Sequence, residues 1–137
     1  MNYRFAWMFV MHTGKRILIA DDSKTMTNII FRILKDANYA DIDVVHDAGS
    51  ALAALHRKEY NLVITDCQMQ PISGPELIKL IRADARLSKV RIILVTGLHD
   101  SDDLLFDGAD GHLKKPFEPQ ALAQKVEDVL STAALLA

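Results

Sequence analysis

Two short apolar segments of the chain end in acidic residues, and this pattern limits the folds that the chain can adopt. Asp21 and Asp22 follow the segment 16–20 (Arg-Ile-Leu-Ile-Ala), and Asp66 follows the segment 61–65 (Asn-Leu-Val-Ile-Thr). Continuous runs of Ile, Leu and Val are typical of strands in a parallel sheet that helices cover on both faces. In such sheets, ligands bind at the edge formed by the carboxyl ends of the strands. We therefore expect the three carboxylates to meet at one edge of a parallel sheet.

Strand and helix patterns alternate along the rest of the chain. The helical segments repeat apolar residues at positions i, i+3, i+4 and i+7, as Met26, Ile29, Ile30 and Ile33 do, and we expect this face to be buried. With right-handed crossovers, the pattern predicts an α/β fold: a doubly wound five-stranded parallel sheet of flavodoxin-like order 2-1-3-4-5, with helices on both faces. The predicted strands are 16–20, 42–45, 61–65, 91–95 and 111–114, and the predicted helices are 23–37, 48–58, 74–83, 100–107 and 118–131.

The length of the chain is that of one domain. Half of the 137 residues are hydrophobic, which is enough for a core. We assign residues 15–131 to the domain, residues 1–14 to an N-terminal extension and residues 132–137 to a short C-terminal tail. The extension contains the apolar run 5–11 (Phe-Ala-Trp-Met-Phe-Val-Met). Three interpretations of this run stay open: a start codon placed too early, a segment packed on the domain, or an apolar contact for a partner or a second copy.

Composition excludes several classes of protein. The net charge of −2 gives no sign of a nucleic-acid surface, which needs clustered Lys and Arg. A single cysteine, Cys67, rules out an internal disulfide and fits a reducing cytoplasm. No apolar run approaches the roughly 18 to 20 residues that span a membrane. We therefore expect a cytoplasmic protein with neither direct nucleic-acid binding nor membrane insertion.

The acidic residues predict a cation site. Asp21, Asp22 and Asp66 would repel one another unless a cation lies between them. Oxygen ligands at few positions, with room for water and a phosphate, suit Mg²⁺. Thr96 and Lys115 follow later strand segments and add a hydroxyl and an ammonium group to the same edge. A carboxylate nucleophile, a metal, a hydroxyl and a lysine together predict transfer of a phosphoryl group onto an aspartate.

This constellation resembles the receiver domain of bacterial two-component response regulators of the CheY type. The resemblance covers residues 15–131, and all of its motifs fall at strand ends. They are Asp21-Asp22-Ser23, Asp66 with Met69, Pro71 and Gly74 after it, Thr96, and Lys115-Pro116-Phe117.

The resemblance implies how the acceptor and the metal are held. Asp66 would accept the phosphoryl group. Asp22 would coordinate Mg²⁺ directly, Asp21 mostly through water, and the backbone carbonyl of Gln68 would be a further ligand. The Gln68 side chain occupies a position at which the family tunes the loss of the phosphoryl group through the attacking water. We also expect one of Asp21 and Asp22 to cap the helix 23–37.

The resemblance also implies the parts of a switch. Thr96 would hydrogen-bond a phosphoryl oxygen, and Lys115 would pair with Asp66 before phosphorylation and with the phosphoryl group afterwards. In the family, the bond before the residue that matches Pro116 is often cis. His112 stands where the family usually has Tyr or Phe, and we expect its ring to swing inward when Thr96 moves.

Three features depart from the family pattern. Gln70 intervenes between Met69 and Pro71, where the family usually places Pro directly after Met. Ser73 replaces a frequent Asp before Gly74. The segment between the switch threonine and the lysine is short, so the predicted helix 100–107 is short and acidic.

The implied function is a stand-alone phosphorylation-dependent signalling switch. It would receive its phosphoryl group from a sensor histidine kinase or a histidine phosphotransfer protein. It would then signal to a protein target through the face formed by the segments 100–107, 111–114 and 118–131. Such a protein catalyses only its own phosphorylation and dephosphorylation and is not otherwise an enzyme. We expect a monomer or a weak dimer.

Three alternatives belong to other functional classes. A pseudo-receiver would bind partners without phosphorylation. A metal-dependent aspartyl-phosphate phosphatase usually has a second Asp two residues after its nucleophile, where this chain has Gln68. A flavin-binding protein of similar fold would need a Ser/Thr/Gly-rich phosphate loop after the first strand, where this chain has Asp21 and Asp22.

Overall fold

The computed structural model describes residues 14–98, 100 and 108–136 and confirms the predicted fold. Five parallel strands form one sheet in the order β2-β1-β3-β4-β5. The predicted N-terminal extension and the predicted helix 100–107, apart from Gly14 and Asp100, lie outside the described residues. The strands are β1 (Arg16–Ala20), β2 (Asp41–Val45), β3 (Leu62–Asp66), β4 (Arg91–Thr96) and β5 (Gly111–Lys114), and the helices are α2 (Lys24–Asp36), α3 (Ala48–Arg57), α4 (Gly74–Ala83) and α5 (Pro119–Leu136).

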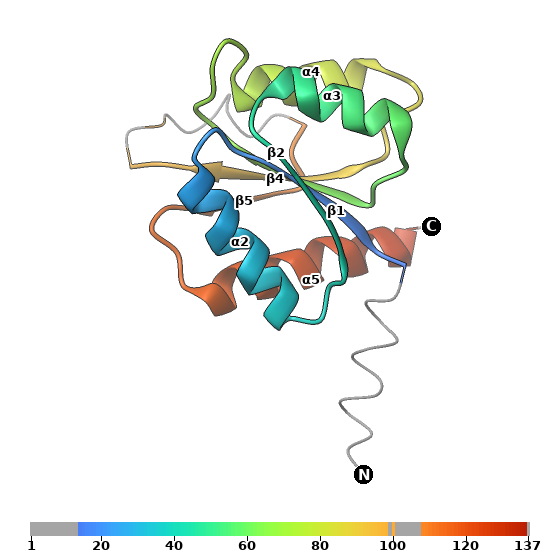
Figure 1. Ribbon diagram of the computed structural model, residues 1–137. Helices are drawn as coiled ribbons and strands as arrows, with labels where there is room; N and C mark the ends of the chain where they lie inside the picture. The colour runs from blue at the N-terminus through green and yellow to red at the C-terminus, as the bar shows by residue number, and fades with distance from the viewer. Residues whose placement is uncertain (1–13, 99, 101–107, 137) are drawn as a thin grey trace.

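The sheet lies between two layers of helices. Figure 1 shows α3 and α4 together on one face of the sheet and α2 and α5 on the other. Each central strand supplies side chains to both layers, since alternate residues of a strand point to opposite faces. Leu18 and Val63 belong to the core under α3 and α4, whereas Ile17 and Ile64 belong to the core under α2 and α5. Burial on both faces explains why these strands are continuously apolar.

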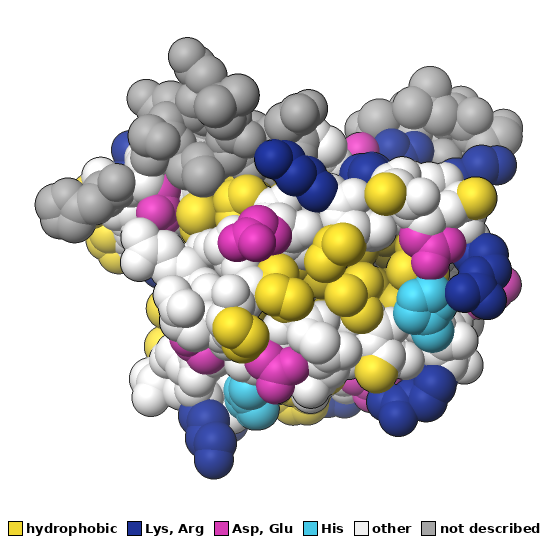
Figure 2. All heavy atoms as spheres, turned by 90° about the horizontal axis from the view of Figure 1, so that it is seen from above, with side chains coloured by type: hydrophobic (Ala, Val, Ile, Leu, Met, Phe, Trp, Pro, Cys, Tyr) yellow, Lys and Arg dark blue, Asp and Glu magenta, His cyan; other side chains and the backbone are white. Residues whose placement is uncertain are grey.

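The outer surface of the α3–α4 layer is separate from the edge at which the strands end. Seen from above (Figure 2), the outer surface of this layer has hydrophobic side chains near its centre and charged and histidine side chains around them.

Among the described helices, none combines the length and the apolar character that a membrane span requires.

Two predicted details of the helices are wrong. The last helix continues to Leu136, past the predicted end at residue 131, so most of the predicted tail 132–137 is helical. The reason is local, because the segment 132–136 is rich in Ala and Leu and contains no Gly or Pro to stop a helix. Ile29 was expected on the buried face of α2 but is 44% exposed, whereas Ile30 is buried.

The beginning of α4 packs directly against the end of β3. Ser73 caps α4 by accepting a hydrogen bond from the Glu76 N–H at 3.2 Å, and the Glu76 carboxylate accepts the Ser73 N–H in return. The Gly74 N–H donates to the Cys67 carbonyl at 2.8 Å. A Cβ atom on Gly74 would lie 2.1 Å from the backbone oxygen of Asp66. Only glycine therefore allows α4 to begin so close to the strand end that carries Asp66.

We predict that Gly74→Ala destabilises the protein by about 1–3 kcal/mol, because the added methyl group must displace the backbone at Asp66. Urea denaturation followed by circular dichroism measures this change. Gly49→Ala is the matched control, because Gly49 lies in α3. A Cβ atom added to Gly49 would have the Asp47 side chain as its nearest neighbour, at 3.4 Å. This substitution should therefore be neutral or stabilising. Equal effects of the two substitutions would contradict this account.

Candidate functional site

The carboxyl ends of the central strands bring the predicted acidic residues together. The register of β1 and β3 pairs Ala20 with Thr65, so the residues that follow these two lie side by side. One carboxylate oxygen from each of Asp21, Asp22 and Asp66 lies within 4.8 Å of the other two. Asp66 is the last residue of β3, whereas Asp21 and Asp22 lie in the turn before α2. The expectation that the carboxylates share one edge of the sheet is confirmed in this geometry.

Asp21 is the most constrained member of the cluster. It is 1% exposed, and its Oδ1 accepts the Ser23 N–H at 2.9 Å. Its buried Oδ2 has no hydrogen-bond partner in the described part of the structure. Burial raises the pKa of the Asp21 carboxyl, and the negative charge of Asp66 raises it further, although the bond from Ser23 acts in the opposite direction. A buried carboxylate oxygen without a partner, facing two further carboxylates, fits a site for a divalent cation.

The prediction that Asp21 or Asp22 caps the following helix is wrong. Ser23 is the N-cap of α2, and its side-chain oxygen accepts the Met26 N–H at 3.1 Å. Ser23 stands directly before the first helical residue with an extended backbone, which is the conformation that a cap requires. The start of α2 is therefore capped by Ser23 and by neither of the two aspartates before it.

Asp66 is held by two donors. It is 8% exposed, and its Oδ1 accepts hydrogen bonds from the Cys67 N–H at 2.9 Å and from Lys115 Nζ at 3.0 Å. Lys115 Nζ also lies 3.8 Å from Asp21 Oδ2. One ammonium group therefore offsets part of the negative charge of two buried carboxylates.

The backbone fixes the position of this lysine. The Lys115 N–H donates to the Thr96 carbonyl at 2.7 Å, and the Lys115–Pro116 peptide bond is cis, as the resemblance implied. Thr96 is the last residue of β4 and is buried beside the strand end that carries Asp66. The structure thus places Asp66, Thr96 and Lys115 at one edge of the sheet.

His112 lies outside this cluster. It is paired with Leu94 in the register of β4 and β5, and its side chain is exposed on the outermost strand. Its proposed role as a moving ring stays a prediction. Lys114 is also exposed, whereas the side chain of Lys115 reaches Asp66.

Sequence reasoning missed two contacts of the site. His46 Nδ1 lies 3.0 Å from the backbone oxygen of Asp21. The strand order offered a signal for this contact, since His46 directly follows β2, the neighbour of β1. Asp100 was interpreted only as part of an acidic helix, yet its carboxylate accepts hydrogen bonds from Gln68 and from the backbone of Gly97. No pattern in the sequence indicates this second contact.

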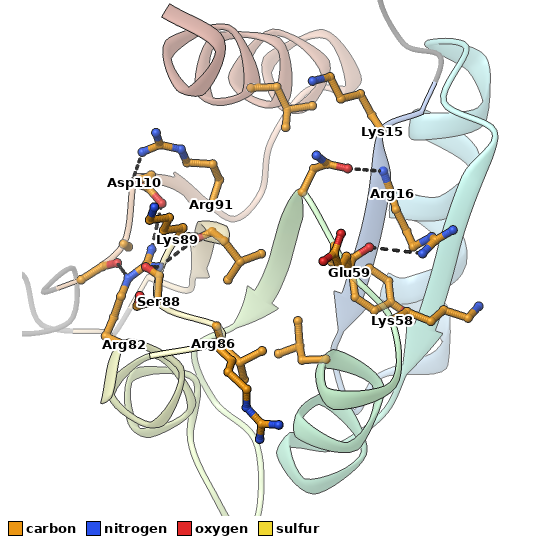
Figure 3. Close-up of a pocket in the computed structure, with 18 of the residues that line it drawn as sticks. Lys15, Arg16, Lys58, Glu59, Arg82, Arg86, Ser88, Lys89, Arg91 and Asp110 are labelled. Carbon is orange, nitrogen blue, oxygen red and sulfur yellow. Dashed lines mark hydrogen bonds and ion pairs between the residues drawn. The ribbon is translucent and has the colours of Figure 1, made fainter. Parts of the chain in front are cut away.

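A cavity of about 1150 Å³ lies at the opposite, amino-terminal edge of the sheet. Figure 3 shows that Lys and Arg side chains surround it. Carboxylates neutralise much of this charge: Arg16 pairs with Asp41 at 2.9 Å, and Arg82 and Arg91 both pair with Asp110. The acidic cluster, at the other edge of the sheet, is therefore the candidate site for chemistry.

Comparison with known proteins agrees with this geometry. The family model for the response regulator receiver domain matches residues 17–127. The chain belongs to the response regulator receiver domain family. It is therefore a component of two-component signalling, in which phosphorylation controls the signal, and its acidic cluster is consistent with the magnesium site of such domains.

Several relatives of this receiver domain are chemotaxis proteins. The chemotaxis protein CheY of Pseudomonas aeruginosa is 32% identical over 117 residues, which cover 83% of this chain and 94% of that protein. CheY1 of Helicobacter pylori is 34% identical over 124 residues, covering 85% of this chain and 98% of that protein. Among solved structures, a response regulator from Chloroflexus aurantiacus superposes with a TM-score of 0.80 at 28% identity, covering 85% of this chain and 98% of that one.

We predict that Asp21→Asn stabilises the protein at pH 7 in the absence of divalent cations, by about 1 kcal/mol. The raised pKa of Asp21 means that folding opposes its ionisation, so wild-type stability falls as the pH rises through that pKa. The advantage of the variant should disappear as the pH is lowered below about 4, where the carboxyl is protonated in the unfolded chain as well. Thermal unfolding between pH 3 and 8 in EDTA tests this, and a variant less stable than wild type at pH 7 would refute it.

Proposed function

We propose that this receiver domain is a phosphorylation-dependent switch that accepts a phosphoryl group on Asp66 with the help of Mg²⁺. The donor is a phosphohistidine of a sensor histidine kinase or of a histidine phosphotransfer protein. The observation that carries this proposal is the arrangement around Asp66: its carboxylate lies beside those of Asp21 and Asp22, and Lys115 Nζ is 3.0 Å from its Oδ1.

The contacts of Asp66 suggest which oxygen reacts. Both of its hydrogen bonds in the described residues are accepted by Oδ1, so we assign Oδ2 as the nucleophile. Oδ2 forms the new bond to phosphorus while the bond from phosphorus to the donor nitrogen breaks. The electron pair leaves with the imidazole of the donor histidine. Lys115 holds the carboxylate in place and stabilises the negative charge of the transferred group.

The carboxylates of Asp21, Asp22 and Asp66 and the backbone carbonyl of Gln68 are the groups that we assign to Mg²⁺. The unpaired, buried Oδ2 of Asp21 supports this assignment, since a cation would satisfy it. When bound, the ion offsets the charge of the phosphoryl oxygens beside these carboxylates.

Phosphorylation adds about 1.5 to 2 negative charges at Asp66. The ammonium group of Lys115 and the hydroxyl group of Thr96 are the donors that we expect to turn toward the new oxygens. The backbone hydrogen bond between these two residues, 2.7 Å long, couples their movements. We infer that this coupling shifts a two-state equilibrium of the face formed by the segment 100–107, β5 and α5, and that a target protein binds this face.

We predict that incubation with phosphoramidate or acetyl phosphate and Mg²⁺ increases the intact mass by one phosphoryl group. Asp66→Asn should abolish the increase, and EDTA should prevent it in the wild type. Asp36→Asn, which changes an exposed carboxylate at the end of α2, should leave it unchanged. A wild type that gains no mass under these conditions would instead favour a partner-binding module that works without phosphorylation.

We predict that Mg²⁺ stabilises the wild-type protein by about 2.7 kcal/mol when its concentration is 100 times the dissociation constant. Asp22→Asn should abolish this gain, since it removes a direct ligand. Without metal, the same substitution should not destabilise the protein, because Asp22 is exposed and its charge repels that of Asp21. Thermal unfolding in a Mg²⁺ titration, with Asp36→Asn as the control, measures both effects, and a full Mg²⁺ response in Asp22→Asn would exclude this residue as a ligand.

A further inference from the structure

One carboxylate joins the two loops that follow β3 and β4. Oδ2 of Asp100 accepts the Gly97 N–H at 2.6 Å, and its Oδ1 accepts a hydrogen bond from Gln68 Nε2 at 2.8 Å. The thiol of Cys67 lies close enough to this carboxylate to lower its pKa. Gly97 directly follows Thr96, and Gln68 lies two residues after Asp66. Asp100 therefore ties together the chain segments that immediately follow the proposed acceptor and the proposed switch threonine.

This tether carries a charge close to Asp66. Partial burial of Asp100 opposes its ionisation, but the hydrogen bonds from Gly97 and Gln68 outweigh this and hold its pKa below the ordinary value. The positive charge of Lys115 lowers the same pKa. Burial raises the pKa of the Cys67 thiol to about 11, and the charge of Asp100 contributes. Lys115 Nζ also donates a hydrogen bond to Asp66, so the charge of Asp100 acts on one of the two groups that hold the acceptor.

The tether also fixes which end of the Gln68 amide is available. Nε2 donates to Asp100, so Oε1 is the end that has no protein partner in the described residues. An amide oxygen accepts hydrogen bonds but is too weak a base to take a proton at neutral pH. Because the Gln68 side chain is exposed, this oxygen can orient a water molecule that arrives from solvent.

We propose that Asp100 is a positioning residue for the hydrolysis of phosphorylated Asp66, because it holds Gln68 with Oε1 directed to the attacking water. This inference rests on the proposed phosphorylation of Asp66. In the reaction, the water oxygen bonds to phosphorus and the bond between phosphorus and the Asp66 oxygen breaks. The electron pair returns to the Asp66 carboxylate, and both protons of the attacking water leave with the inorganic phosphate as dihydrogen phosphate. Asp100 touches neither phosphorus nor water and acts through Gln68.

The lifetime of the phosphorylated protein tests this role. The protein is loaded with acetyl phosphate and Mg²⁺, the donor is removed by rapid desalting, and intact mass is followed with time. Asp100→Asn keeps the shape of the side chain. Its neutral amide group, however, cannot accept hydrogen bonds from both Gly97 and Gln68 as strongly as the carboxylate does. We expect it to lengthen the half-life several-fold, as Gln68→Ala also should, whereas Asp36→Asn should not change it.

The double variant separates positioning from a general effect of charge. If Asp100 acts through Gln68, Asp100→Asn should add little to the half-life of Gln68→Ala. An unchanged half-life in Asp100→Asn would overturn the proposal. So would a full additional effect of Asp100→Asn in the Gln68→Ala background, since Asp100 would then act by another route.

A measurement on the unphosphorylated protein keeps this inference distinct from the proposed function. In ¹⁵N–¹H NMR spectra, the Gly97 amide proton should resonate downfield because it donates a short hydrogen bond to a carboxylate. Asp100→Asn should move it upfield and should shift the side-chain amide signals of Gln68. If these signals do not change, the tether is absent and the inference fails. If they change but the wild type accepts no phosphoryl group, it is the proposed function that fails.

Discussion

The unfavourable proximity of three carboxylates is the constraint on which the rest of the site depends. The buried Oδ2 of Asp21 accepts no hydrogen bond in the described residues, and Lys115 is the cation that forms ion pairs with both Asp21 and Asp66 there. Such a cluster costs free energy unless positive charge is held in place beside it. The fold supplies this charge through the backbone, because the hydrogen bond from Lys115 to Thr96 anchors the lysine at the end of β4. A divalent cation would complete the balance.

Close packing of backbone around Asp66 keeps this arrangement rigid. The absence of a side chain on Gly74 lets α4 begin against the Asp66 carbonyl, and Ser73 caps the helix in place of the aspartate frequent in the family. The extra residue before Pro71 is accommodated in the loop, where the Gln70–Pro71 bond is cis, and α4 still begins at the predicted residue. The departures in this segment therefore leave the strand end and the helix start adjacent.

The contacts of Asp100 join the loops that follow β3 and β4. Asp100, Gln68 and Gly97 form a connection between two strand ends that depends on side chains of this particular chain. It places a further negative charge near the proposed phosphoryl acceptor. In the proposed mechanism, this connection influences the lifetime of phosphorylated Asp66 without taking part in the transfer itself.

Apolar periodicity and the rules of parallel sheets predicted the alternation of strands and helices, the sheet order and the acidic residues at the strand ends, because these features are local or topological. The sequence also placed Thr96 and Lys115 at the same edge. Three contacts could be read only from the folded chain: Ser23 caps α2, His46 contacts Asp21, and Asp100 binds Gln68. In each case several polar groups in the loops could form the hydrogen bond. Which of them does so depends on the distances between them in the folded chain, and no sequence pattern encodes these distances.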